Sequence, residues 1–306
     1  MTMDELREET ARQMDLTPSY NKDKNKNALT LRIIIYLSIL FFLYNTYVTK
    51  IENENISLKK LYSYAISYYN NYDEMAHEAY LLNYKAYEQI ERKEYKKAIA
   101  NLQKVLEKYT KINDEKVKEQ VLYANLNLIW TLQRTKQHSS AIQASNSFID
   151  LYADDSSDIT QVKVAQAMGL KAWSQKELNE RRHANKTYHQ LIAKFTKNKN
   201  TKIQAEVSRA LYNRGHNYMI LGYFEPALQD FNAHLRLYKT NTMRVIREDS
   251  AATMVDKAHI LDKLGRKAEA KLLRKELFAK FKSSESKLIN QALQRALQDS
   301  NKLTNL

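Results

Sequence analysis

A spacing of 43 residues recurs along most of this 306-residue chain and limits the folds that it can adopt. Alanines occupy five positions at this spacing, and aromatic residues occupy a second set of five. A third set holds residue types that begin helices by accepting hydrogen bonds from free backbone N–H groups. A fixed period of this length predicts a solenoid in which each helix pair buries its apolar face against the next. The three sets are Ala98, Ala141, Ala184, Ala227 and Ala270; Tyr109, Tyr152, Phe195, Tyr238 and Phe281; and Asn71, Asp114, Ser157, Asn200 and Ser286, with Thr242 one position out of register.

The stretch 211–238 displays one repeat most clearly. It predicts two amphipathic helices joined by a tight corner at Leu221-Gly222-Tyr223, with Gly215 and Ala227 as the small residues where the helices approach. This arrangement resembles the tetratricopeptide repeat. The usual period of that family is about 34 residues, and a period of 43 also fits HEAT or armadillo arrays. We favour the tetratricopeptide resemblance because the corner and small residue recur at Leu264-Gly265 and Ala270. In the first three copies, the corner glycine is replaced by Lys93, Lys136 and Asn179.

The composition agrees with long helices and short connections. The chain has no cysteine, four glycines and two prolines, too few turn-forming residues for a β-rich fold. The absence of cysteine also excludes disulfides and thiolate catalysis. We therefore expect an all-α fold, and the resemblance implies a right-handed superhelical solenoid of about five helix pairs with capping helices.

An uncharged run at 33–49 predicts an N-terminal membrane anchor over 29–49. A cleaved signal peptide is the first alternative, but no small-residue cleavage site follows the run. A buried core helix is the second, but the preceding segment, 1–28, is a polar tail that we expect to be flexible. A slight excess of basic residues before the run favours a cytoplasmic tail. The Asn, Lys, Tyr and Ile content suggests a low-GC bacterium, with the anchor in the inner membrane and the repeats in the periplasm.

The remaining boundaries follow from the period. Residues 50–71 are expected to form a linker and capping helix, and residues 283–306 a C-terminal capping helix and tail. The repeats fill 72–282, as 72–113, 114–156, 157–199, 200–241 and 242–282.

No motif for catalysis, nucleotide binding or metal binding is present, so we expect a non-enzymatic protein without cofactor or metal. The net charge of +14 supports nucleic-acid binding at the membrane as an alternative function. Lysines alternate with glutamates along the helices, however, which is typical of a solvated surface.

One further column at the same spacing carries large flat side chains. In tetratricopeptide proteins this column faces the concave groove, so the resemblance implies a site for an extended segment of a partner protein. Its aromatic members would supply large contact areas. The alternative is that longer helices turn the column into core between repeats. The candidate partner-binding residues are Tyr87, Trp130, Trp173, His216 and His259 of the column, Tyr80, Tyr123 and Tyr212 one turn away, and Arg209.

The expected function is a membrane-anchored scaffold or assembly factor. The family's known clamp for peptide C-termini requires asparagine where this chain has aromatic residues, so an adaptor for chaperone tails is not expected. The oligomeric state is not indicated by the sequence.

Overall fold

The computed structural model describes residues 58–304, and each element in that range is an α-helix, as expected for an all-α fold. The side chains are described from residue 72 to residue 299. The predicted tail at 1–28 and anchor at 29–49 lie outside these residues. Within 58–304, no helix is long and apolar enough to cross a membrane.

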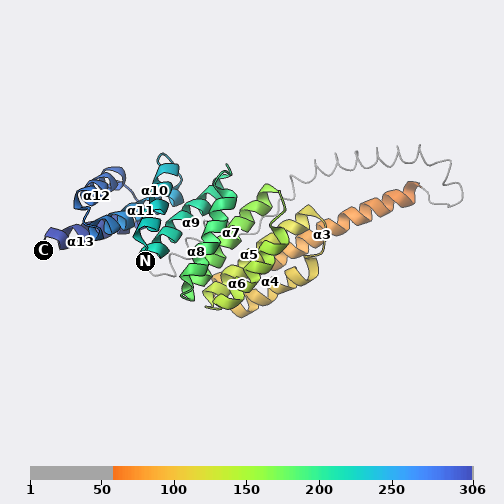
Figure 1. Ribbon diagram of the computed structural model, residues 1–306. Helices are drawn as coiled ribbons and strands as arrows, with labels where there is room; N and C mark the ends of the chain where they lie inside the picture. Colours follow the sequence, from red (N-terminus) through yellow and green to blue (C-terminus); the bar gives the residue numbers. More distant parts are fainter. Residues whose placement is uncertain (1–57, 305–306) are drawn as a thin grey trace. The chain divides into compact units, whose positions relative to one another are not determined.

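The described helices alternate in length along the chain (Figure 1). Between α3 and α13, helices of 20 residues follow helices of 14 or 15 residues. The 20-residue helices are the first helices of the predicted repeats, and the shorter ones are the second helices. The bounds are α3 Leu58–Glu91, α4 Tyr95–Tyr109, α5 Glu115–Arg134, α6 His138–Tyr152, α7 Asp158–Glu177, α8 Arg181–Phe195, α9 Thr201–Ile220, α10 Phe224–Leu237, α11 Arg244–Lys263, α12 Lys267–Phe281 and α13 Lys287–Thr304.

The helices fall into two compact units that divide within α5, between Asn127 and Leu128. In the unit before this point, α3 packs on α4, and the Asn83 side chain of α3 donates to the Gln120 carbonyl of α5 over 2.9 Å. Helix α3 continues through Asn71 without a break. The helix start predicted at Asn71, and with it a separate linker helix ending at residue 71, are therefore wrong.

In the unit from Leu128 onwards, each of the helices from α6 to α12 packs on the helix that follows it. The longer helices α7, α9 and α11 also pack on one another in order, and α11 packs on α13. The space between paired helices is filled by the predicted columns, whose alanines and aromatic residues are all buried. At Gly215 the paired helices approach closely, because an added Cβ atom would lie 2.5 Å from the Phe231 ring.

The corners between paired helices have one geometry in all five repeats. A residue in the left-handed conformation ends each first helix, and its N–H donates to the carbonyl three residues earlier. The next N–H donates to the carbonyl five residues earlier, which makes each corner a Schellman motif. The left-handed residues are Lys93 (φ 62°), Lys136 (φ 60°), Asn179 (φ 61°), Gly222 (φ 78°) and Gly265 (φ 74°).

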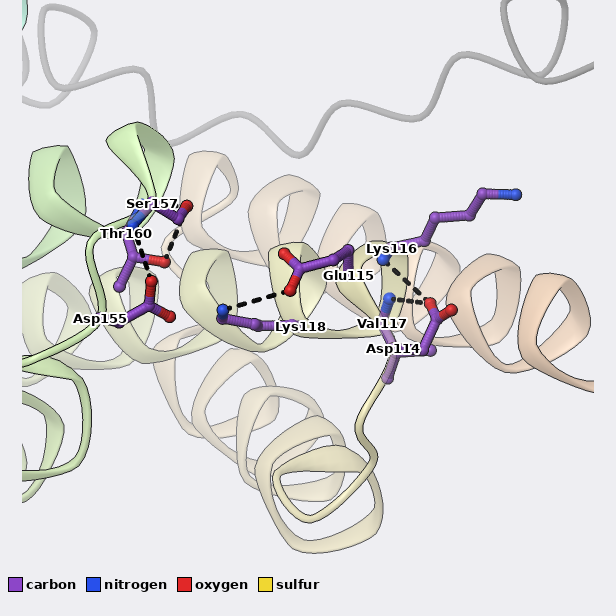
Figure 2. A network of polar contacts seen from close by, with 8 residues as sticks. All are labelled: Asp114, Glu115, Lys116, Val117, Lys118, Asp155, Ser157 and Thr160. Atoms are coloured by element: carbon purple, nitrogen blue, oxygen red, sulfur yellow. Dashed lines mark hydrogen bonds and ion pairs between the residues drawn. The ribbon is translucent and has the colours of Figure 1, made fainter. Parts of the chain in front are cut away.

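Four of the predicted helix-start residues cap their helices. Asp114 Oδ1 accepts hydrogen bonds from the backbone N–H groups of Lys116 and Val117, as Figure 2 shows. Ser157 Oγ accepts from the Thr160 N–H and also from the Thr160 hydroxyl, and Figure 2 shows the contact between the two side chains. Asn200 Oδ1 accepts from the backbone N–H groups of Lys202 and Ile203. Ser286 Oγ accepts from the Ile289 N–H.

Thr242 is the exception among the described repeats. Helix α11 begins at Arg244, and its N-cap residue is Met243, whose side chain makes no capping hydrogen bond. The cap predicted at Thr242 is therefore wrong.

The C-terminal helix α13 covers α11 and α12. Its residues Ile289, Ala292, Leu293 and Ala296 are buried, as predicted for a capping helix. Leu288 of the same helix is half-buried and lines a cavity.

Candidate functional site

A cavity of about 380 Å³ lies in the unit that begins at Leu128. Its walls are formed by the end of α5 and by α7, α9, α11 and α13, with Tyr188 contributed by α8. The successive first helices of the repeats therefore turn one face toward the same space.

The aromatic wall contains the two tryptophans of the chain, Trp130 and Trp173. Trp130 is 7% exposed, and the guanidinium of Arg134 lies 5.3 Å from its ring centroid. Trp173 is half-buried, and Lys176 Nζ lies 5.6 Å from its ring centroid. Both rings thus have a neighbouring cation at a distance that permits cation–π attraction.

Gln133 fixes the aromatic wall of the cavity. Its side-chain amide donates to the Leu170 carbonyl over 2.7 Å and to Ser174 Oγ over 2.8 Å. Because Gln133 is buried, losing either bond would leave a polar group unsatisfied. These bonds join α5 to α7 and so fix the positions of Trp130 on α5 and Trp173 on α7 relative to each other.

Carboxylates of α9 and α11 form the acidic wall of the cavity. Glu206 of α9 is 4% exposed, and its Oε1 accepts a hydrogen bond from Arg209 over 3.0 Å. Glu248 of α11 is paired with Arg244 at 2.8 Å. Its neighbour Asp249 accepts a 2.7 Å hydrogen bond from the Ser208 hydroxyl.

Burial changes the ionisation of this wall. It raises the pKa of Asp249 to about 7, with the charges of Glu206 and Glu248 adding to the rise. The charge of Arg209 and the hydrogen bond from Ser208 oppose it. Burial also raises the pKa of Glu206, against the charge and hydrogen bond of Arg209. Ionised carboxylates here are poorly solvated, and a nearby cation would stabilise them.

A second charged group lies at one edge of the cavity. Asp256 is fully buried; its Oδ2 lies 2.7 Å from His216 Nδ1, and its Oδ1 accepts from Arg295 over 2.9 Å. Burial alone would raise the pKa of Asp256, but His216 and Arg295 outweigh it and hold this pKa below its usual value. The Tyr212 ring lies 5.9 Å from the His216 ring.

The contacts of Ser208 resemble a catalytic arrangement but differ from one. Its hydroxyl lies 2.9 Å from His234 Nε2 and donates to Asp249. In a serine triad the acid contacts the histidine and orients it, whereas here it contacts the serine. Ser208 is also fully buried, so its hydroxyl is not accessible to a substrate.

The structure brings together four of the predicted partner-binding residues: Trp130, Trp173, Arg209 and Tyr212 line the cavity. The burial of Trp130 agrees with the alternative that this column forms core between repeats, whereas Trp173 is half-buried. His216 contacts Tyr212 beside the cavity, and His259 Nδ1 lies 4.0 Å from Asp299.

The other three predicted residues belong to the unit that ends at Asn127. Tyr80 and Tyr87 are half-buried, and Tyr80 lies next to Tyr84, with ring centroids 6.1 Å apart. Tyr123 is 4% exposed and therefore part of the core, because its position on α5 faces inward.

The acids of the cavity were not among the residues predicted from the sequence. Glu206 and Asp249 are 43 residues apart, so the period placed both on one face, but carboxylates alternating with lysines indicated a solvated surface. One sequence signal could have revealed them: these two acids recur at the 43-residue spacing of the buried alanines and aromatic residues. Among the described residues, no group of histidine and acidic side chains is arranged to hold a metal ion.

Comparisons with known proteins give little further information. No known family and no curated protein matches this chain. Among solved structures, the crystal structure of an engineered protein aligns over 67% of this chain and 80% of its own, at 15% sequence identity and a TM-score of 0.41.

Proposed function

We propose that this chain is a membrane-anchored scaffold of the tetratricopeptide kind that holds an extended segment of a partner protein in the cavity. The observation that carries the proposal is the cavity itself. Four 20-residue helices and α13 contribute to it, and it combines aromatic, apolar and charged side chains. A hollow with apolar walls and a few convergent polar groups is the usual form of a binding site.

The repeat architecture supports a tetratricopeptide-like superhelix. Five Schellman corners and buried alanine and aromatic columns recur with one spacing. Anchoring by residues 29–49 is supported by the uncharged run in the sequence. It would hold the cavity, and any bound segment, near a membrane.

The cavity does not favour nucleic acid as the partner. Arg209 and Arg295 each contact a carboxylate, and Lys176 Nζ lies 3.2 Å from Glu177. A surface that binds phosphate groups presents basic side chains to the ligand. The net charge of +14 alone is no reason to prefer this alternative.

Photo-crosslinking in the producing cells tests the proposal. A benzoylphenylalanine placed at Asn213, which lines the cavity, should crosslink the full-length chain to a discrete partner. Ala252→Trp, which fills the same cavity, should abolish the crosslink. The matched control is Ala279→Trp, which adds the same ring at an exposed position of α12. A crosslink that survives Ala252→Trp, or is lost equally in Ala279→Trp, would contradict the proposal.

A further inference from the structure

We propose that the cavity takes a lysine or arginine side chain of the partner segment, with the cationic group against Glu206 and Asp249. This inference rests on the proposed function and names the chemistry that the site recognises. It follows from the balance of charges in the walls of the cavity and from the space beside Glu206.

Glu206 presents one oxygen that no described residue bonds. Arg209 Nη1 donates to Oε1, and Oε2 has no hydrogen-bond partner among residues 72–299. Oε2 lies beside Gly169, where an added Cβ atom would be 3.1 Å from it. Glycine at this position leaves room next to a carboxylate that is more than nine-tenths buried. An acceptor oxygen on a largely buried side chain that lines a cavity can accept a hydrogen bond from a ligand.

Asp249 supplies the negative charge that a cation would balance. Glu206 is paired with Arg209, and Glu248 with Arg244. The hydrogen-bond partner of Asp249 among the described residues is the neutral Ser208 hydroxyl. Among residues 72–299, Asp249 therefore makes no ion pair, although the charge of Arg209 acts on it.

Of the four basic side chains that line the cavity, Arg134 lies over the Trp130 ring and the other three each contact a carboxylate. Lys176 contacts Glu177, Arg209 contacts Glu206, and Arg295 contacts Asp256. An acidic ligand would have to compete with these carboxylates, whereas a basic ligand gains Asp249. The charges therefore favour a cationic group.

The apolar lining fits the remainder of such a side chain. Leu170, Val245, Ala252, Leu288 and Ala292 also line the cavity. Lysine and arginine bury their methylene stems on apolar surface while their charged ends reach polar partners. The cavity thus offers separate surfaces for the stem and for the charge.

Peptide display on the full-length chain tests this inference. Selection from random twelve-residue peptides should enrich lysine or arginine at one fixed position. The enriched peptides, synthesised and titrated against tryptophan fluorescence, should bind Asp249→Asn at least about tenfold more weakly. Asp249→Glu, which keeps the charge, should retain binding. Glu276→Gln, which removes one charge from an exposed position of α12, should bind like the wild type.

The outcomes separate this inference from the proposed function. Asparagine can still accept the Ser208 hydrogen bond, so Asp249→Asn should fold. Circular dichroism checks that it does. Glu206→Gln provides a second variant for the binding measurement. Enrichment of acidic or uncharged peptides, or unchanged binding by both variants, would overturn the inference and leave a peptide-binding cavity. Failure of every peptide to bind the wild type would overturn both.

Discussion

Lysine occupies a conformation at two repeat corners that suits glycine better. Lys93 and Lys136 have φ near 60°, in the left-handed region, where a Cβ atom crowds the following carbonyl. Gly222 and Gly265 hold the same position in later repeats without this cost. In the sequence, the first three copies lack the glycine of the corner motif. The structure keeps the motif, because its two backbone hydrogen bonds do not depend on the side chain.

Lys136→Gly should therefore stabilise the protein. We expect the free energy of unfolding to rise by about 0.5–1 kcal/mol. Glycine removes the strain of the left-handed conformation, and its greater entropy in the unfolded chain offsets part of this gain. Urea unfolding of the full-length chain measures it. Asn179→Gly is the control and should gain less, because asparagine tolerates this region. A loss of stability in Lys136→Gly would show that the lysine side chain has a structural role.

Asp249→Asn should stabilise the protein at neutral pH but not in acid. The folded pKa of Asp249, about 7, lies above the unfolded value of about 3.9. The folded state therefore binds more protons between these values, and stability is lost as pH rises toward 7. Asparagine has no such loss, so its advantage should grow from near zero at pH 4 to roughly 1–4 kcal/mol at pH 8.

Unfolding of both proteins across this pH range measures the difference. Arg209, Glu206 and Ser208 of α9 and Glu248 of α11 act on Asp249, and they remain in both proteins. Burial lowers the pKa of His234, the α10 residue that contacts Ser208, to about 4. Its titration cancels in the comparison. A difference independent of pH would contradict an ionised, poorly solvated Asp249.

At the scale of the helices, packing within a repeat depends on small residues. An added methyl at Gly215 would lie 2.5 Å from the Phe231 ring, so Gly215→Ala should cost about 1–3 kcal/mol. Phe231→Leu in the same background should recover part of this loss. A double-mutant cycle measures the coupling, which should exceed about 0.5 kcal/mol. Ala258, at the equivalent position one repeat later, shows that alanine is tolerated where the facing residue differs. Additive losses would rule out the contact.

The two tryptophans should differ in their contribution to folding. Trp130 is 7% exposed, so Trp130→Ala should cost about 3–5 kcal/mol. Trp173 is half-buried, and its truncation should cost clearly less. Urea midpoints of the two variants measure this, with Ala279→Trp as a surface control. Equal losses would mean that both rings belong to the core and that neither is free to meet a partner.

The helices and their columns could be predicted from sequence because one period acts on every repeat. A buried alanine and a buried aromatic residue recur in all five repeats, and a capping side chain begins four of the helices. The continuous helix α3 could not be predicted in this way, because Asn71 is a capping residue type and helix propensity around it is not decisive. The acids of the cavity could not be predicted, because the sequence pattern of a carboxylate that faces solvent is the same as that of a carboxylate that lines a cavity.

At the scale of the whole molecule, residues 29–49 are expected to anchor the chain. The hydrophobic run predicts that carbonate extraction leaves the full-length protein in the membrane pellet. Replacing Ile34, Leu37 and Leu40 by lysine should release it, because each charge in the hydrocarbon core is unfavourable. Replacing Lys22, Lys24 and Lys26 by glutamine is the control and should leave it in the pellet. Wild-type protein in the supernatant would contradict the anchor.

Tryptophan fluorescence tests the central claim most directly, because both tryptophans line the cavity. The measurement is a titration of the full-length chain with a synthetic peptide covering the segment crosslinked from Asn213. We predict a saturable change in emission in Trp130→Phe, which reports on Trp173, and no change when Ala252→Leu also fills the cavity. Binding without any change in the emission of Trp173, or binding unaffected by Ala252→Leu, would contradict the account.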